Sequence, residues 1–98
     1  MKYENVCDED LYSMAELFKN FSDLTRVKIL NFLMEKEANV GEIAVALSMS
    51  PSSISHQLRV LKQARLIKYQ KEGKHIYYSL KDEHVLQIMA TALEHVRE

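Results

Sequence analysis

The feature that most constrains the fold is a sharp break, Ser48-Met49-Ser50, near the middle of the chain. The segment before the break starts at Asn39 and has apolar residues at helical spacing, namely Val40, Ile43, Ala44 and Leu47. Ser50 can cap the segment after the break, and Pro51 then takes the first helical position, where the missing N–H of proline is not needed. The sequence therefore predicts two short helices joined by a tight turn.

The second of these helices, PSSISHQLRVLKQA, predicts a surface for nucleic acid. Ile54, Leu58 and Leu61 share one face and are expected in the core. The rest of the helix combines short hydrogen-bonding side chains near its N-terminus with cations further along, which is the layout needed to read base edges and to bind phosphates. His56 is therefore interpreted as a DNA-facing residue rather than a metal ligand. The predicted DNA-binding residues here are Ser52, Ser53, Ser55, His56, Gln57, Arg59 and Lys62.

The next stretch predicts an antiparallel hairpin with strands at about Leu66–Lys71 and His75–Leu80, and Gly73 in the turn can take a positive φ. Lys71 and Lys74 are predicted DNA contacts, because cations at a hairpin tip can reach a neighbouring phosphate or the minor groove. A helix, a tight turn, a basic helix and a basic hairpin are typical of a winged helix-turn-helix. The side chains expected to be buried in the hairpin are Ile67, Tyr69, Ile76, Tyr78 and Leu80.

The charge of the chain is unevenly distributed. Its net charge is −1, but residues 48–81 contain seven basic side chains and one acid, Glu72. That region therefore carries +6, and the remainder carries −7. A basic region on an otherwise acidic protein favours a local face for a polyanion over a merely solvated surface, because the charge coincides with the predicted helix-turn-helix.

The whole chain predicts one small domain, residues 1–98, mainly α-helical with a small β-hairpin. Residues 1–9 are expected to form a mobile N-terminal arm. Asp10 is the predicted cap of a first helix that ends at about Asn20, and Ser22 or Asp23 caps a second that ends at about Lys36. A chain of 98 residues has a thin core, which a dimer interface would extend. The expected buried stripe of the second helix is Leu24, Val27, Leu30, Leu33 and Met34.

The sequence also predicts the cellular compartment of the chain. No apolar run is long enough to span a membrane, and the N-terminus MKYENVCDED lacks the hydrophobic core of a signal peptide. The single cysteine, Cys7, excludes an intrachain disulfide and suits a reducing cytosol, so we expect a cytoplasmic protein. Cys7 could be a metal ligand or a redox group, but it is interpreted as incidental.

Residues 80–98, LKDEHVLQIMATALEHVRE, predict one amphipathic helix at the end of the chain. With a rotation of about 100° per residue, its apolar side chains fall on one arc. His84, His95 and Glu98 fall along one rim of that arc. The apolar arc consists of Val85, Ile88, Met89, Ala92, Leu93 and Val96.

The spacing of the two histidines in this helix predicts a site shared between two chains. His84 and His95 project on nearly the same bearing but are about 16 Å apart along the axis, so one helix cannot bring both to one ion. Two antiparallel copies can, with Asp82 and His84 from one chain beside His95 and Glu98 from the other. Two imidazoles and two carboxylates form a plausible tetrahedral zinc site. The alternative is a solvated face, with Asp82 as a helix cap and Glu98 as a frayed end.

The stretch VGEIAVALSMSPSSISHQLRVLKQARLIKYQKEGKHIYYSL resembles the DNA-binding core of the ArsR/SmtB family of bacterial metal-sensing repressors. The resemblance covers nearly all of residues 14–98, and the SSISHQLRVLK run followed by GKHIYYSL is its most specific part. It implies a homodimeric winged helix-turn-helix that binds double-stranded operator DNA, with the first and last helices at the dimer interface.

The same resemblance implies the metal. The last helix matches a subgroup pattern, Asp-x-His, ten residues, then His-x-x-Glu or His-x-x-His, which is the regulatory site of zinc-sensing members. Here the pattern assigns Asp82, His84, His95 and Glu98 as ligands. A cysteine site of other members is lost at Asn39 and Gly41, which argues against thiolate-bound arsenic, cadmium or lead. The remaining ligands favour Zn(II), with Co(II) as a surrogate in vitro.

The resulting hypothesis is a repressor that zinc releases from an inverted-repeat operator, which derepresses metal efflux or sequestration genes. One alternative keeps DNA binding but makes the metal site structural or silent. Another is a zinc-binding interaction dimer whose basic region is incidental. An enzyme that acts on a small organic substrate is not expected, because a zinc ion with four protein ligands has no open position and no nucleophile–base pair accompanies a predicted pocket.

Overall fold

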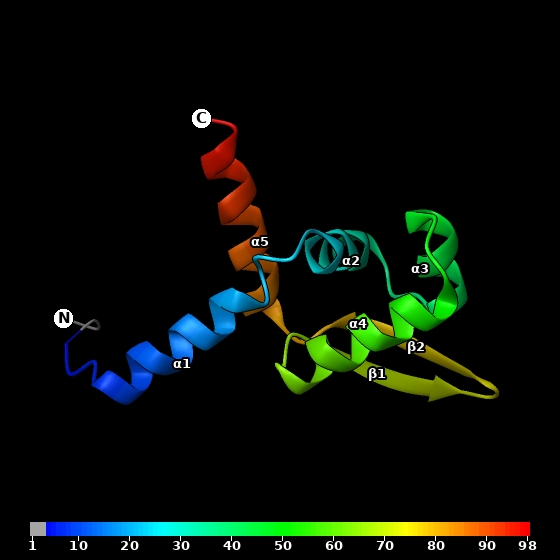
Figure 1. The fold of residues 1–98 in the computed structure, drawn as a ribbon, viewed down its shortest axis with the longest axis horizontal. Coiled ribbons are helices and arrows are strands. Elements are labelled where there is room, and N and C mark those ends of the chain that lie inside the picture. Colours follow the sequence, from blue (N-terminus) through cyan, green and yellow to red (C-terminus); the bar gives the residue numbers. More distant parts are fainter. Residues whose placement is uncertain (1–3) are drawn as a thin grey trace.

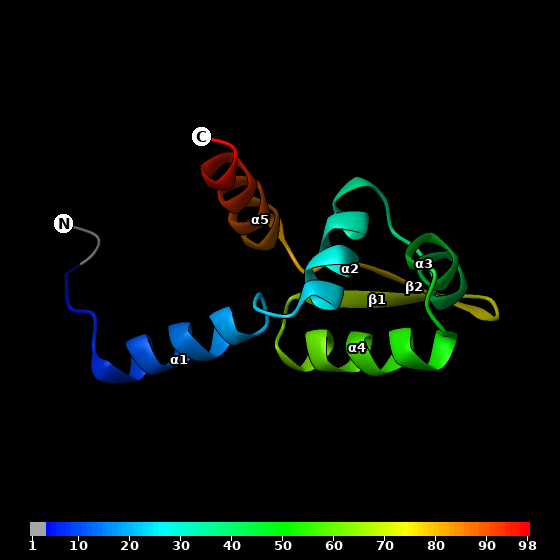
Figure 2. The ribbon, with the colours of Figure 1, turned by 45° about the horizontal axis from the view of Figure 1, so that its top comes forward.

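The structure is a computed structural model that describes residues 4–98. Five helices and one two-stranded antiparallel sheet are found in this part of the chain. In Figure 1 and Figure 2, α1 extends away from the body of the molecule, and α5 rises from the end of the hairpin. The elements are α1 (Asp8–Lys19), α2 (Leu24–Glu35), α3 (Val40–Leu47), α4 (Pro51–Gln63), β1 (Ile67–Glu72), β2 (His75–Leu80) and α5 (Glu83–Val96).

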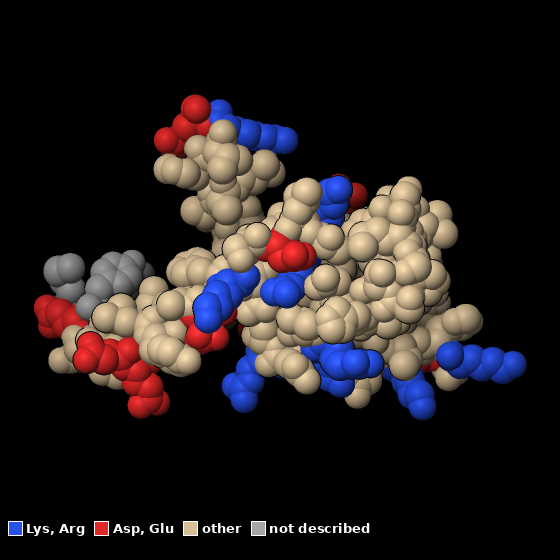
Figure 3. All heavy atoms as spheres, in the orientation of Figure 1, with Lys and Arg blue, Asp and Glu red and all other residues tan. Residues whose placement is uncertain are grey.

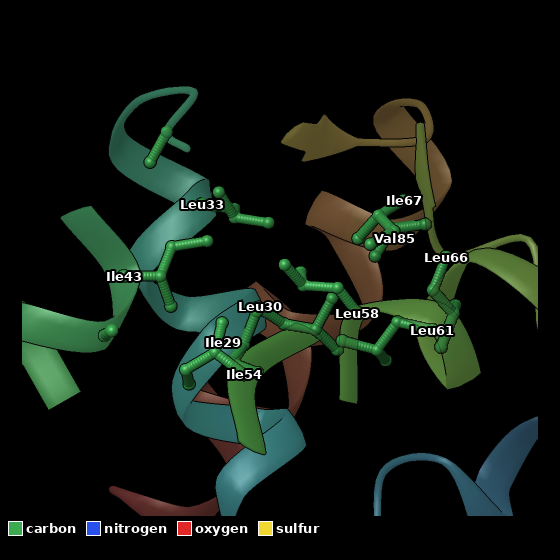
Figure 4. Close-up of a cluster of buried hydrophobic side chains, with 12 residues drawn as sticks. Ile29, Leu30, Leu33, Ile43, Ile54, Leu58, Leu61, Leu66, Ile67 and Val85 are labelled. Carbon is green, nitrogen blue, oxygen red and sulfur yellow. The ribbon is translucent and has the colours of Figure 1, made fainter. Parts of the chain in front are cut away.

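The core lies where α2, α3, α4, the start of β1 and the first turn of α5 meet (Figure 4). It is entirely apolar among the described residues, with no buried polar or charged side chain. The predicted core face of α4, Ile54, Leu58 and Leu61, is confirmed, since all three side chains are at most 1% exposed. The other core members are Ile29, Leu30, Leu33, Ala38, Ile43, Ala44, Leu66, Ile67 and Val85.

Local capping chemistry explains where most of the helices begin. The side chains of Asp23, Asn39, Ser50 and Asp82 each accept a backbone N–H from the first turn of the following helix. Ser50 and Asp23, one of the two predicted caps of α2, are confirmed, and Asn39 and Asp82 stand where their helices are predicted to start. The break after α3 is confirmed by a left-handed Ser48 with φ 55°. The start of α1 was predicted too late.

Helix α1 begins at Asp8 instead of following a cap at Asp10. Cys7 is its N-cap residue, and the Cys7 N–H donates to the Asp10 carboxylate at 3.2 Å. Asp8, Glu9 and Asp10 therefore occupy the first turn, where acidic side chains stabilise the positive end of the helix dipole. The predicted arm of residues 1–9 is thus too long at its C-terminal end, and residues 1–3 of that arm lie outside the described residues.

The hairpin forms as predicted, but two of the five side chains expected to be buried are exposed. The strands pair from Ile67 with Leu80 to Glu72 with His75, and a two-residue turn with Gly73 at φ 63° joins them. Ile67 is buried, whereas Tyr69 is 48% exposed and Ile76 is 36% exposed. Ile76 lies in the distal half of the hairpin, which projects beyond the helices that cover its base (Figure 1), whereas the Tyr69 ring lies under the Lys62 ammonium. Alternation alone therefore does not predict burial at either position.

The α2 stripe was also only partly correct. Leu30 and Leu33 are buried, but Leu24 is 67% exposed and Ile29 is buried instead.

A bridge that the sequence did not predict joins β2 to the segment that follows α2. The backbones of Ala38 and Tyr78 exchange two hydrogen bonds, of 3.0 Å and 2.7 Å.

Two helices leave apolar surface uncovered within one chain. Helix α1 buries no residue, and its Leu11, Met14 and Phe18 are each about half exposed. Helix α5 buries only Val85, while Leu93 is 42% and Val96 is 75% exposed. None of the helices in residues 4–98 is long and apolar enough to cross a membrane.

Candidate nucleic-acid interface and metal-binding helix

The N-terminal half of α4 presents a row of small polar side chains to solvent. Ser50 caps the helix by accepting the Ser53 N–H at 3.2 Å, and its hydroxyl also donates to the Ser53 hydroxyl at 2.9 Å. Ser52, Ser53, Ser55, His56 and Arg59 are all exposed, as predicted for a DNA-reading face. Polar side chains and the free N–H groups of a helix N-terminus are the donors that phosphates and base edges need.

The Gln57 side chain is not fully exposed to solvent like these residues. It is half-buried, and its Oε1 accepts a hydrogen bond from Arg26 Nε at 3.0 Å. Arg26 Nη1 also donates to Asn20 Oδ1 at 3.3 Å, so the guanidinium links the end of α1 and the start of α2 to α4. Because arginine can only donate, the Gln57 oxygen faces Arg26. The prediction that Gln57 points outward is therefore only partly right, and Arg26, 31 residues away, gave no local signal of the link.

The hairpin of β1 and β2, which is the wing of this fold, carries its cations where the sequence predicts them. Lys74 lies in the two-residue turn and Lys71 lies in the second strand pair from the turn, opposite Ile76, and both are exposed. Lys62 lies at the other end of α4, with its ammonium 4.1 Å from the centroid of the Tyr69 ring. This cation–π contact ties the end of α4 to β1. Figure 3 shows Lys and Arg side chains along the edge formed by α4 and the hairpin.

Two of the metal-ligand candidates lie together at the start of α5. Asp82 caps the helix through Oδ1, which accepts the His84 and Val85 N–H groups at 2.9 Å and 3.4 Å. His84 Nδ1 lies 3.5 Å from the same oxygen. The His84 side chain is 85% and that of Asp82 is 48% exposed, so both can be reached by an ion. The second carboxylate oxygen of Asp82 takes no part in the cap.

The other two candidates lie at the opposite end of the helix. His95 occupies the last turn of α5 and Glu98 is the last residue, and both are exposed. Within residues 4–98 of one chain, no three His, Cys, Asp or Glu side chains come close enough together to hold a metal ion. Cys7 is exposed at the start of α1 and belongs to no such group. One chain therefore supplies two half-sites, Asp82 with His84 and His95 with Glu98, rather than one complete site.

An apolar hollow lies between α2 and the C-terminal half of α5. It has a volume of about 320 Å³. Its walls are mostly apolar, and its α5 residues belong to the arc predicted from the helical period. The residues lining it are Phe21, Val27, Asn31, Met34, Met89, Ala92, Leu93 and Val96.

The sequence of the chain matches a known family of bacterial proteins. Residues 23–69 match the family described as bacterial regulatory protein, arsR family. The chain is 43% identical over 96 residues to the cadmium resistance transcriptional regulatory protein CadC homolog of Staphylococcus aureus, which covers 97% of this chain and 79% of that protein. The chain therefore belongs to the arsR family of bacterial regulatory proteins.

A second relative is the transcriptional repressor SmtB homolog of Synechocystis sp., which is 39% identical over 85 residues. The match covers 87% of this chain but only 64% of the length of that relative. These relatives are named as transcriptional regulators, which agrees with the expectation that the chain is not an enzyme.

Solved structures confirm the winged helix-turn-helix. The homodimeric DNA-binding domain of Mb0332 from Mycobacterium bovis aligns with a TM-score of 0.86 and 28% identity, over 96% of this chain and 90% of that one. The solution structure of apo-NmtR aligns with a TM-score of 0.82 and 32% identity, over 94% of this chain and 77% of that one. The arrangement of α3, α4 and the hairpin is thus that of a DNA-binding fold.

Proposed function

We propose that the chain is a transcriptional repressor that binds an inverted-repeat operator as a dimer and leaves the DNA when zinc binds between the two chains. Genes for metal efflux or sequestration are the proposed targets, in the cytoplasm. The observation that carries the proposal is the pair of half-sites at opposite ends of α5, on a helix whose apolar face one chain leaves uncovered. The relatives named as an SmtB-type repressor and a CadC-type cadmium resistance regulator support it.

The exposed polar row of α4 supports the DNA-binding step. Ser52, Ser55 and His56 offer short hydrogen-bonding groups to base edges in a major groove. Arg59 further along the helix, and Lys71 and Lys74 on the wing, supply charge for phosphates. Two copies related by a two-fold axis would place two α4 helices in successive major grooves, which is why the operator is proposed to be an inverted repeat.

The exposed apolar surfaces of α1 and α5 support the dimer. Leu93 and Val96 of α5 and Leu11 and Phe18 of α1 would be removed from water by a second copy. The aligned Mb0332 domain is described as homodimeric. A two-fold interface is self-complementary, and a two-fold axis perpendicular to α5 would make the helix run antiparallel to its own copy, which is the arrangement we propose.

That antiparallel pairing is what completes the proposed metal site. It brings the Asp82–His84 end of one α5 beside the His95–Glu98 end of the other, and a dimer then holds two sites. The donor set of two imidazoles and two carboxylates fits a tetrahedral Zn²⁺, and the exposure of the His84 ring leaves a nitrogen free for it. The ion would neutralise the carboxylates and hold the two helices at one angle. Co²⁺ would occupy the same ligands as a spectroscopic surrogate.

The link from metal to DNA runs through the junction before α5. The Lys81 N–H donates to the Leu66 carbonyl at 3.0 Å, which ties the end of β2 to the segment that follows α4. In the proposed dimer, His95 of a second copy would lie near this junction, where its outer ring nitrogen could bond to the backbone near Arg65. Zinc must favour the DNA-free geometry, and by linkage DNA must weaken zinc binding by the same factor.

The test is a titration of the protein–DNA complex with zinc. Fluorescence anisotropy of a labelled promoter duplex is measured at fixed salt, because phosphate contacts make the affinity steeply salt-dependent. We expect tight binding to the promoter, weaker binding to a scrambled duplex, and a collapse of promoter binding near one zinc per protomer. Tight, sequence-dependent binding that ignores zinc would contradict the metal switch, and equal weak binding to both duplexes would contradict the repressor itself.

A further inference from the structure

A basic hollow lies at the end of α4 that is remote from the predicted base-reading residues. It has a volume of about 260 Å³ and is lined by Lys62, Arg65, Lys68 and Lys81, together with Ile67 and Tyr69. No carboxylate lines it. Four cations around one hollow repel one another. An anion placed among them would be attracted to all four and would offset that repulsion.

The backbone and one side chain hold these cations in place. The Lys62 ammonium lies over the Tyr69 ring, 4.1 Å from its centroid, which restrains an otherwise flexible side chain. The hydrogen bond from the Lys81 N–H to the Leu66 carbonyl places the Lys81 backbone beside the segment that carries Arg65 and Lys68. The hollow is therefore built from three elements, α4, β1 and the end of β2, that are joined to one another.

Arg65 occupies a backbone position that suits glycine better. Its φ is 61°, in the left-handed region. Helix α4 ends in a Schellman arrangement, in which the Leu66 N–H donates to the Leu61 carbonyl and the Arg65 N–H to the Lys62 carbonyl, both at 3.0 Å. Glycine takes this conformation without strain, so arginine here is an outlier that requires an explanation. A cation placed at the mouth of the basic hollow supplies one.

We propose that the basic hollow binds a phosphate of the DNA backbone, as a contact separate from the base-reading half of α4 and from the wing tip. The inference rests on the proposed DNA binding and adds Arg65, Lys68 and Lys81 to the interface. Lys62 lies ten residues beyond Ser52, about 15 Å along the helix axis. The major groove is about 12 Å wide, so a helix whose N-terminal half reads bases reaches the sugar–phosphate backbone at its C-terminal end.

The position of the hollow on the surface agrees with this occupant. The hollow borders α4 and β1, the elements along which Lys and Arg side chains gather in Figure 3. The first turn of α1 is acidic, and Figure 3 shows Asp and Glu side chains at the α1 end of the molecule, away from α4 and the hairpin. DNA bound against α4 would therefore meet the hollow and not the acidic turn.

The experiment measures the salt dependence of DNA binding for Lys68→Gln and Lys81→Gln. The matched control is Lys28→Gln, because Lys28 is exposed on α2 and lines a different hollow. Each lost phosphate contact should reduce the slope of log K against log salt by about 0.9, hence by about 1.8 for the two chains of a dimer. The loss of affinity should be equal on the promoter and on a scrambled duplex, since a phosphate carries no sequence information.

The variant Arg65→Gly separates an effect on the phosphate contact from an effect on the stability of the fold. The variant should keep or raise the melting temperature, because glycine relieves the left-handed strain, while its salt slope falls as in Lys68→Gln. Wild-type slopes for all three variants would overturn the proposal, and so would a loss of affinity confined to the promoter. If the wild-type protein itself shows no DNA binding, the proposed function fails rather than this contact, so the two failures are distinguishable.

Discussion

Replacing His95 by asparagine is expected to abolish the release of DNA by zinc while leaving the metal-free protein's DNA affinity within about twofold of wild type. His95 is exposed in the last turn of α5, and none of the proposed DNA-binding residues belongs to that helix, so its loss removes no proposed DNA contact. It does remove one of the four proposed ligands and the ring nitrogen that would signal to the α4 end. Loss of a partner that only orients a metal ligand already costs about 10–100-fold in metal affinity, and loss of the ligand itself should cost at least as much.

The measurement for His95→Asn is the zinc titration of the anisotropy of the promoter complex, with zinc affinity measured in parallel. Glu94→Gln is the control, because Glu94 is an exposed acid on the same helix that belongs to neither half-site. Glu94→Gln should respond to zinc like the wild type. A His95→Asn protein that still leaves DNA at the wild-type zinc concentration would show that the switch does not pass through this residue.

Replacing Leu58 by alanine is expected to destabilise the fold by about 3.5 kcal/mol, the middle of the range for a buried leucine truncation. Leu58 is 1% exposed and lies among the side chains that α2, α4 and the hairpin bring together (Figure 4). The substitution removes apolar contacts and leaves a cavity that well-packed neighbours cannot fill. For a domain of this size, each kcal/mol lowers the melting temperature by about 4–8 °C.

The melting temperature of Leu58→Ala should be measured at one fixed protomer concentration, because dimer stability depends on concentration. Val45→Ala is the control, since Val45 is 83% exposed on α3 and its truncation should change stability by less than about 0.5 kcal/mol. Equal melting temperatures for the two variants would contradict the assignment of Leu58 to the core.

Much of the fold could be predicted because its signals are local. The caps at Asn39, Ser50 and Asp82 each lie within three residues of the N–H group that they accept. The core face of α4 follows from the helical period, which needs no knowledge of the rest of the molecule. The tight turn after α3 and the glycine turn of the hairpin are equally local.

The errors arise where distant segments decide the outcome. Leu24 has the apolar character of a core residue, but no element covers it and it is 67% exposed. Tyr69 alternates correctly along β1, yet its ring faces the Lys62 ammonium rather than the core. The sequence predicts Gln57 as a DNA-facing side chain, but its oxygen accepts a hydrogen bond from Arg26. None of these contacts has a signature in the neighbouring sequence.

The placement of the candidate metal ligands on α5 could be predicted from the sequence. The helical period separates His84 from His95 within one chain, and the structure places them at the two ends of α5. The basic hollow, by contrast, could not be anticipated, because it depends on Lys81 lying beside the segment that follows α4. The basic excess of residues 48–81 includes all four of its cations, but that excess does not show that they share one hollow.

The central claim, that each zinc site takes ligands from two chains, is tested most directly by a mixed dimer. One variant carries Asp82→Asn and His84→Asn, and the other carries His95→Asn and Glu98→Gln, so either homodimer lacks both sites. When the two are co-expressed and the mixed dimer is isolated with two different tags, one intact set of four ligands is restored. We predict one tightly bound Co²⁺ with a tetrahedral spectrum per mixed dimer and none in either homodimer. Equal metal binding in all three dimers, or none in the mixed dimer while the wild-type protein binds, would contradict a site shared between chains.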